Sequence, residues 1–232
     1  ATPPGAFSHV LYGRAVISLL QDRSGTLWVG TANGLTYLDP AKPELTGYFR
    51  GVTYDDPTGI SGGIVFTMIQ DQSDALWLGT GSGMGGPVGL DRRDPGTGSF
   101  THYRHDPADP ASLGSGEVYA VWPDRQSRLW VGTEAGLNRL DGSSEGFVHY
   151  RHDPADPASL AHDTITAILE DSAGRLWVGT AAGLDLLDSA QNRFVHYRYD
   201  RNDPQSLGGD LVLTLFEDRS GVLWIGTTAG VS

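Results

Sequence analysis

Five similar apolar segments recur along the sequence. The residue just before each segment is polar or small and differs from one segment to the next: Arg14, Gly63, Gly116, Asp163 and Asp210. If the segments surround a common mouth, one cation and two carboxylates lie at a concave surface, which is the usual place for a ligand. Asn33 and Glu134 lie in loops expected at the same end and are lesser candidates. The alternative is that these side chains form an ordinary solvated rim. The pattern predicts a binding site and no catalytic residue.

Histidines could serve as metal ligands or as a general base, but their spacing argues against both roles. His102, His149 and His196 follow one another at intervals of 47 residues, always in the context Phe-x-His-Tyr. Equivalent positions on separate sheets lie much farther apart than the ~2 Å of a zinc–nitrogen bond. We therefore predict that these histidines pack structurally, that the chain holds no metal and that it needs no cofactor.

Pairs of aspartates three residues apart recur in Asp-Pro loops, at 106 and 109, 153 and 156, and 200 and 203. Such pairs could contribute to a calcium site, which needs about six to eight oxygen ligands. They could equally cap turns in which proline fixes φ. The loops do not contain a set of oxygen ligands spaced by glycines, as a calcium-binding loop would. The sequence therefore favours turn capping. No nucleophile elbow, Walker loop or His-Glu-x-x-His helix motif occurs in the sequence.

The elements that position these residues belong to a repeat. The tetrapeptide Trp-[Val/Leu/Ile]-Gly-Thr occurs at 28–31, 77–80, 130–133, 177–180 and 224–227. Before each copy come an apolar run, an aspartate and a short turn. After it come Gly-Leu and Leu-Asp positions and then an outer Phe-x-His-Tyr segment. Nearly continuous apolar runs indicate strands buried on both faces. Each repeat therefore predicts a four-stranded antiparallel sheet.

Such a sheet cannot bury two apolar faces alone, but sheets stacked face to face around an axis can. We predict an all-β protein with a single β-propeller domain over residues 1–232, either a five-bladed ring or five blades of a longer array. An open β-solenoid is the rival architecture, but its repeats are usually shorter. The repeated tryptophans are predicted to be structural: Trp28, Trp77, Trp130, Trp177 and Trp224.

The fifth repeat ends inside its third strand. The segment from Ala6 to Leu11 is apolar enough to complete that sheet and close the ring. Otherwise the exposed sheet edge is prone to pair with another chain. Self-association through the incomplete fifth blade is therefore one predicted partner interaction. An insertion of six residues falls at Gly81–Gly86, between the second and third strands of its repeat.

The amino-acid composition argues against several classes of function. The chain has 232 residues with 32 glycines, no cysteine and a formal net charge of −12. That charge argues against binding to nucleic acid or to an anionic membrane surface, because both require a basic footprint. The absence of cysteine excludes disulfides and thiolate chemistry. No stretch of about 18 apolar residues occurs, so we predict no membrane contact by this segment.

The repeat resembles the two-component regulator propeller repeat. The resemblance rests on Glu170-Asp171-Ser-Ala-Gly174-Arg-Leu176-Trp177-Val-Gly179-Thr180 followed by Gly183-Leu184, and on Tyr150-Arg151-His152-Asp153-Pro154 running into Ser159-Leu160. It covers almost the whole chain. It implies the periplasmic or extracellular sensor part of a hybrid two-component system, which often senses oligosaccharides. The sequence departs from the pattern in having five repeats and no membrane segment or kinase.

The predicted function is therefore ligand sensing by a non-enzymatic propeller, with an oligosaccharide as the expected ligand class at the loop face. One alternative is a protein-interaction scaffold without a small-molecule site. A third is a lyase-like enzyme, because the repeat is distantly similar to the streptogramin-lyase propellers.

Overall fold

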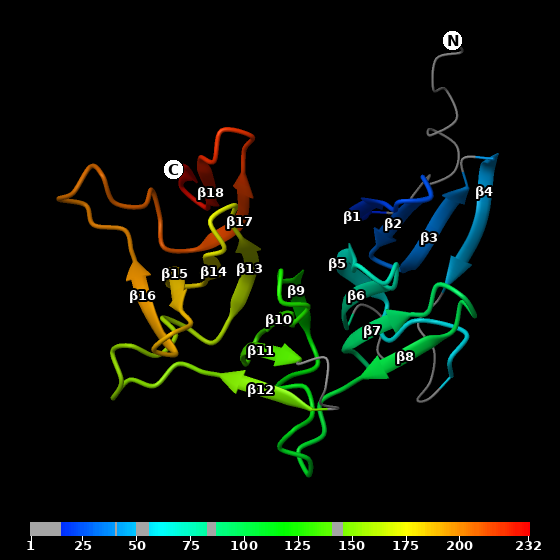
Figure 1. Ribbon diagram of the computed structural model, residues 1–232, viewed down its shortest axis with the longest axis horizontal. Coiled ribbons are helices and arrows are strands. Elements are labelled where there is room, and N and C mark those ends of the chain that lie inside the picture. The colour runs from blue at the N-terminus through cyan, green and yellow to red at the C-terminus, as the bar shows by residue number, and fades with distance from the viewer. Residues whose placement is uncertain (1–14, 40, 50–55, 83–86, 141–145) are drawn as a thin grey trace. The chain divides into compact units, whose positions relative to one another are not determined.

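The computed structural model describes residues 15–39, 41–49, 56–82, 87–140 and 146–232. Over these residues the regular structure consists of β-strands gathered into five antiparallel sheets (Figure 1). The chain divides into two compact units, one formed by residues 1–104 and 116–118 and the other by 105–115 and 119–232. Arg14, the segment 6–11 and most of the insertion at 81–86 lie outside the described residues.

The first unit contains two complete four-stranded meanders in which sequential strands pair. The first sheet comprises β1 (Val16–Gln21), β2 (Leu27–Thr31), β3 (Gly34–Asp39) and β4 (Lys42–Phe49). The second sheet comprises β5 (Ile64–Gln70), β6 (Leu76–Gly81), β7 (Leu90–Arg93) and β8 (Phe100–Tyr103).

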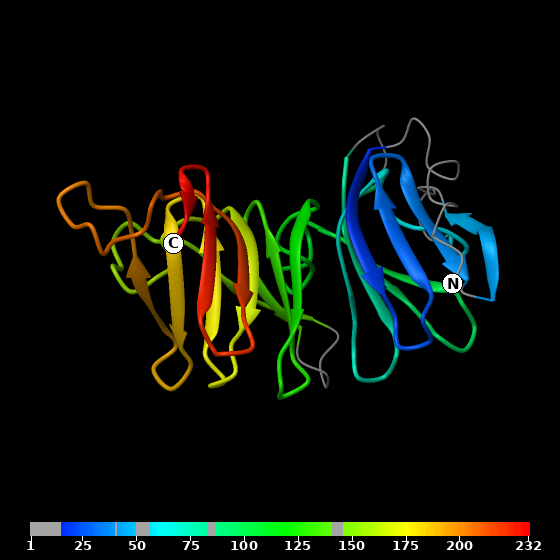
Figure 2. The same ribbon diagram turned by 90° about the horizontal axis from the view of Figure 1, so that it is seen from above.

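The other unit carries the remaining sheets, apart from the first residue of β9. The third sheet comprises β9 (Val118–Pro123), β10 (Leu129–Thr133), β11 (Gly136–Leu140) and β12 (Phe147–Tyr150). The fourth comprises β13 (Ile165–Glu170), β14 (Leu176–Thr180), β15 (Gly183–Asp188) and β16 (Arg193–Tyr197). The fifth comprises β17 (Val212–Glu217), β18 (Leu223–Thr227) and β19 (Gly230–Val231). In Figure 2 its red strands lie beside the yellow strands of the fourth sheet.

Every sheet is a propeller blade built on the predicted repeat, so the fold class is the predicted all-β propeller with five blades. The fifth sheet has three strands, as its truncated repeat predicts. In each blade the turn between the first two strands needs one residue with positive φ. Glycine supplies it in three blades, with φ of 79° at Gly174, for example, whereas Asp74 and Ser127 adopt 65° and 60°. The repeat thus tolerates a residue other than glycine at this turn, at some cost in backbone strain.

One aspartate organises each of these turns and the tryptophan that follows it. In the fourth sheet, Asp171 Oδ2 accepts hydrogen bonds from Trp177 Nε1 at 2.8 Å and Arg175 Nε at 2.6 Å. Its Oδ1 accepts backbone N–H groups within the turn. Burial alone would raise the pKa of Asp171, but the hydrogen bonds from Trp177 and Arg175 outweigh burial and lower it. The carboxylate therefore stays ionised and fixes the indole orientation.

The same Trp–Asp bond, 2.7–2.9 Å long, occurs in all five blades. The oriented indole then packs on the next sheet along the chain. Trp28 joins a cluster with Val65, Met68 and Leu76 of the second sheet. Trp130 likewise packs with Ile165 and residues of β14.

A second inter-sheet contact places a β-branched side chain over the glycine of Trp-x-Gly-Thr. We call the β-branched residue the knob and the glycine the notch. A methyl group built on Gly132 would lie 2.6 Å from Ile165 Cγ2, and one on Gly179 would lie 2.6 Å from Val212 Cγ1. A side chain at the notch would therefore force the sheets apart. The four covered knobs are completely buried: Val65, Val118, Ile165 and Val212.

Trp224 departs from the pattern of the other repeated tryptophans. It is 47% exposed, whereas Trp28, Trp77, Trp130 and Trp177 are at most 8% exposed. On β18, the flanking Leu223 and Ile225 pack against the fourth sheet. Because side chains alternate along a strand, Trp224 points to the opposite face of the fifth sheet. At this position the Trp–Asp bond is present, but the indole ring is half exposed.

Replacing the turn aspartate should destabilise a buried blade more than the exposed one. We expect Asp171→Ala to lower the free energy of unfolding by about 2–3 kcal/mol. The substitution leaves the buried indole N–H of Trp177 without an acceptor and removes the hydrogen bonds that hold the turn. Asp218→Ala is the matched control, since water can replace its bond to the exposed Trp224. Urea unfolding of both variants measures the difference. An equal loss in the two variants would contradict burial as the source of the effect.

Candidate functional site

Two of the predicted rim residues come together in the second unit. The backbone carbonyl of Asp163 accepts a hydrogen bond from Gly136 N at 2.8 Å, which places Asp163 beside the loop between β10 and β11. Glu134 lies in that loop, is exposed, and accepts a 2.8 Å hydrogen bond from Ser115 Oγ. The structure therefore puts two carboxylates at one end of neighbouring sheets.

The predicted rim aspartates also have structural roles. Asp163 Oδ1 accepts the backbone N–H of His152 at 2.7 Å, and Asp210 Oδ1 accepts that of Tyr199 at 2.8 Å. Each carboxylate thus closes the connector that leads into its own blade. Asn33 is exposed in the loop between β2 and β3 of the first unit. The structure does not bring the five candidates into a single cluster, because Arg14 lies outside the described residues and Asn33 belongs to the other unit.

The repeated histidines hold the connectors in place. His102 Nδ1 lies 2.7 Å from Asp91 Oδ1, and its Nε2 lies 2.9 Å from the carbonyl oxygen of Asp56. His196 makes the same pair of contacts, 2.6 Å to Asp185 Oδ1 and 2.9 Å to the carbonyl oxygen of Pro157. In the third sheet, His149 uses Asn138 in place of the aspartate. Both ring nitrogens are thus occupied, as the predicted structural role requires.

The contacts of His102 favour a protonated ring at this position. Because the groups facing the two nitrogens of His102 are acceptors, N–H groups on both nitrogens satisfy them best. The hydrogen bond to Asp91 is the main factor that raises the pKa of His102. Asp91 is fully buried and also accepts the backbone N–H of Ser61 at 2.6 Å. The hydrogen-bonded His102–Asp91 pair therefore ties the third and fourth strands of the second sheet to the preceding connector.

The Asp-Pro loops cap their own turns. Asp106 Oδ1 accepts the backbone N–H of Ala108, and Asp109 Oδ1 accepts that of Ala111, each at 2.9 Å. The loops starting at Asp153 and Asp200 repeat both bonds. Over the described residues no group of three or more metal-ligating side chains gathers. Turn capping, the interpretation favoured by the sequence, accounts for these carboxylates.

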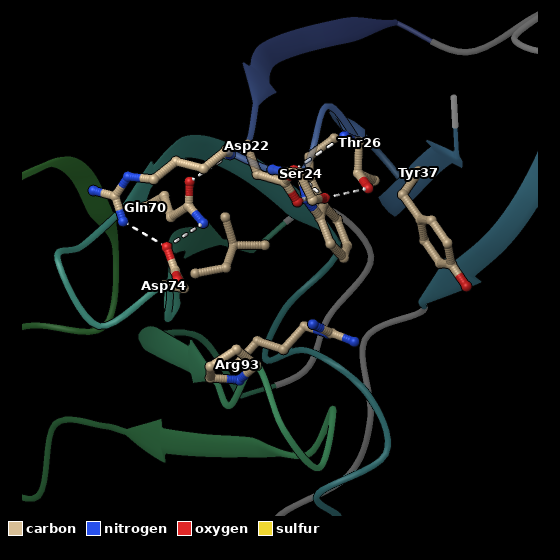
Figure 3. A pocket seen from close by; sticks show the side chains of 11 residues that line it. Asp22, Ser24, Thr26, Tyr37, Gln70, Asp74 and Arg93 are labelled. Atoms are coloured by element: carbon tan, nitrogen blue, oxygen red, sulfur yellow. Dashed lines mark hydrogen bonds and ion pairs between the residues drawn. The ribbon is translucent and has the colours of Figure 1, made fainter. Parts of the chain in front are cut away.

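A cavity of about 520 Å³ lies between the first and second sheets, within the first unit. Its lining comes from the turn after β1, from Trp28 and Tyr37 on β2 and β3, from Gln70 and Asp74, and from Arg93 at the end of β7. Figure 3 shows Gln70 and Asp74 on one side of the cavity and Tyr37 on the other. This volume is within the range of small-molecule sites, about 300–1,000 Å³. The cavity lies at the opposite end of the sheets from the loop that carries Asn33.

Most polar groups of the cavity are fixed by one another. Asp22 accepts bonds from Ser24, Thr26 and Trp28. Arg23 pairs with Asp74 and also donates to the carbonyl oxygen of Asp71 at 2.8 Å. The rings of Trp28 and Tyr37 lie with their centroids 5.0 Å apart. These hydrogen bonds, the ion pair and the ring contact fix the side chains that line the cavity without any contribution from a ligand.

Arg93 is the exception in this cavity. Its Cζ lies 5.2 Å from the centroid of the Trp28 ring, and its buried Nε has no hydrogen-bond acceptor among the described residues. A buried donor without an acceptor is costly, so this N–H favours a ligand that supplies one. Arg93 pairs with Leu76 across the sheet, where the other complete blades have leucine, at Leu38, Leu140 and Leu187. Arg93 is not among the candidates that the repeat pattern predicted, although a charge at a leucine position of the repeat was a signal in the sequence.

The blades of this chain define a β-propeller whose sheets share one repeat, and three of the repeats match the model of the two-component regulator propeller family. That family's model matches residues 13–33, 159–182 and 206–229. These segments cover the turn and Trp-Gly-Thr strand of the first, fourth and fifth blades. No curated protein matches the chain in a sequence search.

Two solved structures from B. thetaiotaomicron are similar to this chain. One is the extracellular domain of a protein assigned to the hybrid two-component systems, with 26% identity and a TM-score of 0.78 over 94% of this chain and 28% of that domain. The other is the extracellular domain of a protein assigned to the one-component systems, with 25% identity and a TM-score of 0.74 over 94% of this chain and 27% of that domain. The chain therefore spans less than a third of either relative.

A more distant similarity shows the fold alone. Virginiamycin B lyase from Staphylococcus aureus has 13% identity and a TM-score of 0.65, over 94% of this chain and 69% of the lyase.

No helix in the described residues is long and apolar enough to cross a bilayer.

The His102–Asp91 pair should make stability depend on pH. A raised folded-state pKa stabilises the fold below the unfolded pKa of about 6.5, and this contribution is lost as pH rises through the folded pKa. We expect the free energy of unfolding of the wild type to fall more steeply between about pH 6 and pH 8 than that of His102→Gln. Denaturant titrations across this range measure the slopes. His162→Gln, at an exposed loop histidine, is the control and should keep the wild-type slope.

Proposed function

We propose that this chain is the ligand-binding part of an exported sensor protein and that its ligand is a glycan. Sensor function and an extracellular or periplasmic location are supported by the family of the repeats and by the two similar extracellular domains. Similarity to propeller lyases concerns the fold alone, so the proposal assigns binding and no turnover.

The glycan class is supported by the chemistry of the cavity in the first unit. Sugars offer hydroxyl groups that accept and donate hydrogen bonds, together with C–H faces that pack on aromatic rings. Trp28 and Tyr37 supply rings, and Arg93 supplies a donor that needs an acceptor. The observation that carries the proposal is the buried Arg93 Nε at a position where the repeat otherwise has leucine.

The rim residues form a second candidate place for the same ligand class. Glu134 and Asp163 lie at one end of neighbouring sheets, and each carboxylate can accept hydrogen bonds from sugar hydroxyl groups. Asp210 completes this candidate set within the second unit. The rim supplies carboxylates, but the cavity combines rings, a cation and fixed walls, which makes the cavity the preferred site.

Replacing Arg93 by the residue that the repeat normally carries tests the cavity. We expect Arg93→Leu to fold with at least wild-type stability, because leucine suits this position in three other blades. It should weaken binding of a glycan identified in an oligosaccharide screen by about tenfold or more, since one charge-assisted hydrogen bond contributes roughly 1.5–3 kcal/mol. Isothermal titration calorimetry measures the affinity and thermal unfolding the stability.

Glu134→Gln and Tyr37→Ala complete the design. Tyr37→Ala should weaken binding by removing a ring, whereas Glu134→Gln should leave the affinity unchanged. If Glu134→Gln weakens binding and Arg93→Leu does not, the ligand occupies the rim and the cavity assignment is wrong. If no oligosaccharide binds the wild type, the glycan class itself fails.

A further inference from the structure

The cavity of the first unit borders a position where two other blades carry an arginine. In the third and fourth blades the residue four positions after the turn aspartate is an arginine, whose Nε donates to Oδ2 of that aspartate at 2.6 Å: Arg128 to Asp124 and Arg175 to Asp171. The first blade has Thr26 at this position, and Thr26 lines the cavity. Its shorter side chain leaves the equivalent carboxylate oxygen open toward the cavity.

Asp22 is therefore an acceptor with unused capacity. Its Oδ1 accepts hydrogen bonds from Ser24 Oγ and from the backbone N–H of Thr26. Among the described residues its Oδ2 accepts only the indole N–H of Trp28. Burial raises the pKa of Asp22, but the hydrogen bonds from Ser24 and Trp28 outweigh burial and lower it. The ionised carboxylate can thus accept a further hydrogen bond at Oδ2, for example from a ligand hydroxyl group.

Arg93 offers the opposite charge across the same cavity. Figure 3 shows Arg93 on one side, with Asp22 and Thr26 on the other. The Cζ of Arg93 lies 5.2 Å from the centroid of the Trp28 ring, and a methyl group built on Gly98 would lie 3.1 Å from its Nη2. The ring and the turn after β7 thus restrict the position of the guanidinium group.

No carboxylate in the described part of the chain neutralises this guanidinium. The side chain of Asp94, the next residue, binds its own turn and lies 4.0 Å from Arg92 instead. Asp74, on the cavity wall, is already paired with Arg23. The buried Nε of Arg93 has no acceptor among the described residues. A planar guanidinium matches a carboxylate in charge and shape, so an anionic group is the complement that the cavity lacks.

We propose that this cavity binds a sugar that carries a carboxylate, with the carboxylate on Arg93 and a sugar hydroxyl group donating to Asp22 Oδ2. The inference rests on the proposed glycan function and names the class of sugar. A neutral sugar leaves the charge of Arg93 unpaired, and an acid without hydroxyl groups leaves the acceptor at Asp22 unused. Recognition therefore requires both groups on one ligand.

Calorimetric titration of the whole chain with matched sugar pairs tests the proposal. The members of each pair differ only at the exocyclic carbon, which is a carboxylate in one and a hydroxymethyl group in the other: oligomers of galacturonate and galactose, of glucuronate and glucose, and of mannuronate and mannose. We expect one acidic member to bind about tenfold or more tightly than its neutral counterpart, because a charge-assisted hydrogen bond is stronger than a neutral one. Arg93→Leu should abolish this preference. Arg93→Lys keeps the charge without the planar fork and should retain part of it.

Thr26→Arg tests the acceptor at Asp22. It installs the residue that the third and fourth blades carry, so the variant should fold. The new side chain should occupy Asp22 Oδ2 and part of the cavity, and binding of the acidic sugar should weaken by about tenfold or more. Val222→Arg is the matched control, since Val222 holds the equivalent position of the fifth blade, is 49% exposed and lies outside the cavity. It should bind the acidic sugar like the wild type, and circular dichroism establishes that all variants fold.

The outcomes separate this inference from the glycan proposal. Equal affinity for the acidic and neutral members would overturn the carboxylate assignment and leave the glycan proposal standing. Binding of adipate, a dicarboxylate without hydroxyl groups, but of no sugar would overturn both, as would the absence of binding by every probe. If the acid preference survives in Arg93→Leu, or if Thr26→Arg binds like the wild type, the acidic sugar does not occupy this cavity and the assignment is wrong.

Discussion

The carboxylate of the turn aspartate sets the geometry on which each blade depends. It binds the backbone of the turn through one oxygen and the indole N–H of tryptophan through the other. The short hairpin and the largest apolar side chain of the blade are thereby fixed relative to each other. Because the indole N–H has its acceptor, the rest of the ring can be buried between sheets without the cost of an unpaired donor.

Inter-sheet packing follows from this orientation. The tryptophan occupies one side of its strand and the glycine two residues later leaves a notch on the same side. A valine or isoleucine from the following sheet fills the notch and becomes completely buried. The contact has a direction, since each sheet gives a notch on one side and a knob on the other.

Positions where the repeat varies carry the features that point to binding. The connectors are held by repeated histidine and aspartate contacts, so their carboxylates are largely used by the fold itself. Arg93 differs because it places a cation where packing favours leucine, beside an indole and a tyrosine ring. A charged residue that displaces an apolar core residue costs stability, and its presence there is easiest to understand through a ligand.

Periodicity in the sequence by itself determined the five blades, their strand order within each sheet, the turns with positive φ and the shortened fifth sheet. Those features depend on local chemistry and on a pattern that recurs about every 50 residues, so a single chain displays them directly. Tertiary structure alone decided which of the candidate rim residues meet and that Arg93 borders a cavity. It also decided that Trp224 is exposed while its four counterparts are buried. These outcomes depend on which sheet covers which face. Because the repeat has nearly the same sequence in every copy, the sequence of one copy does not indicate whether another sheet packs against it.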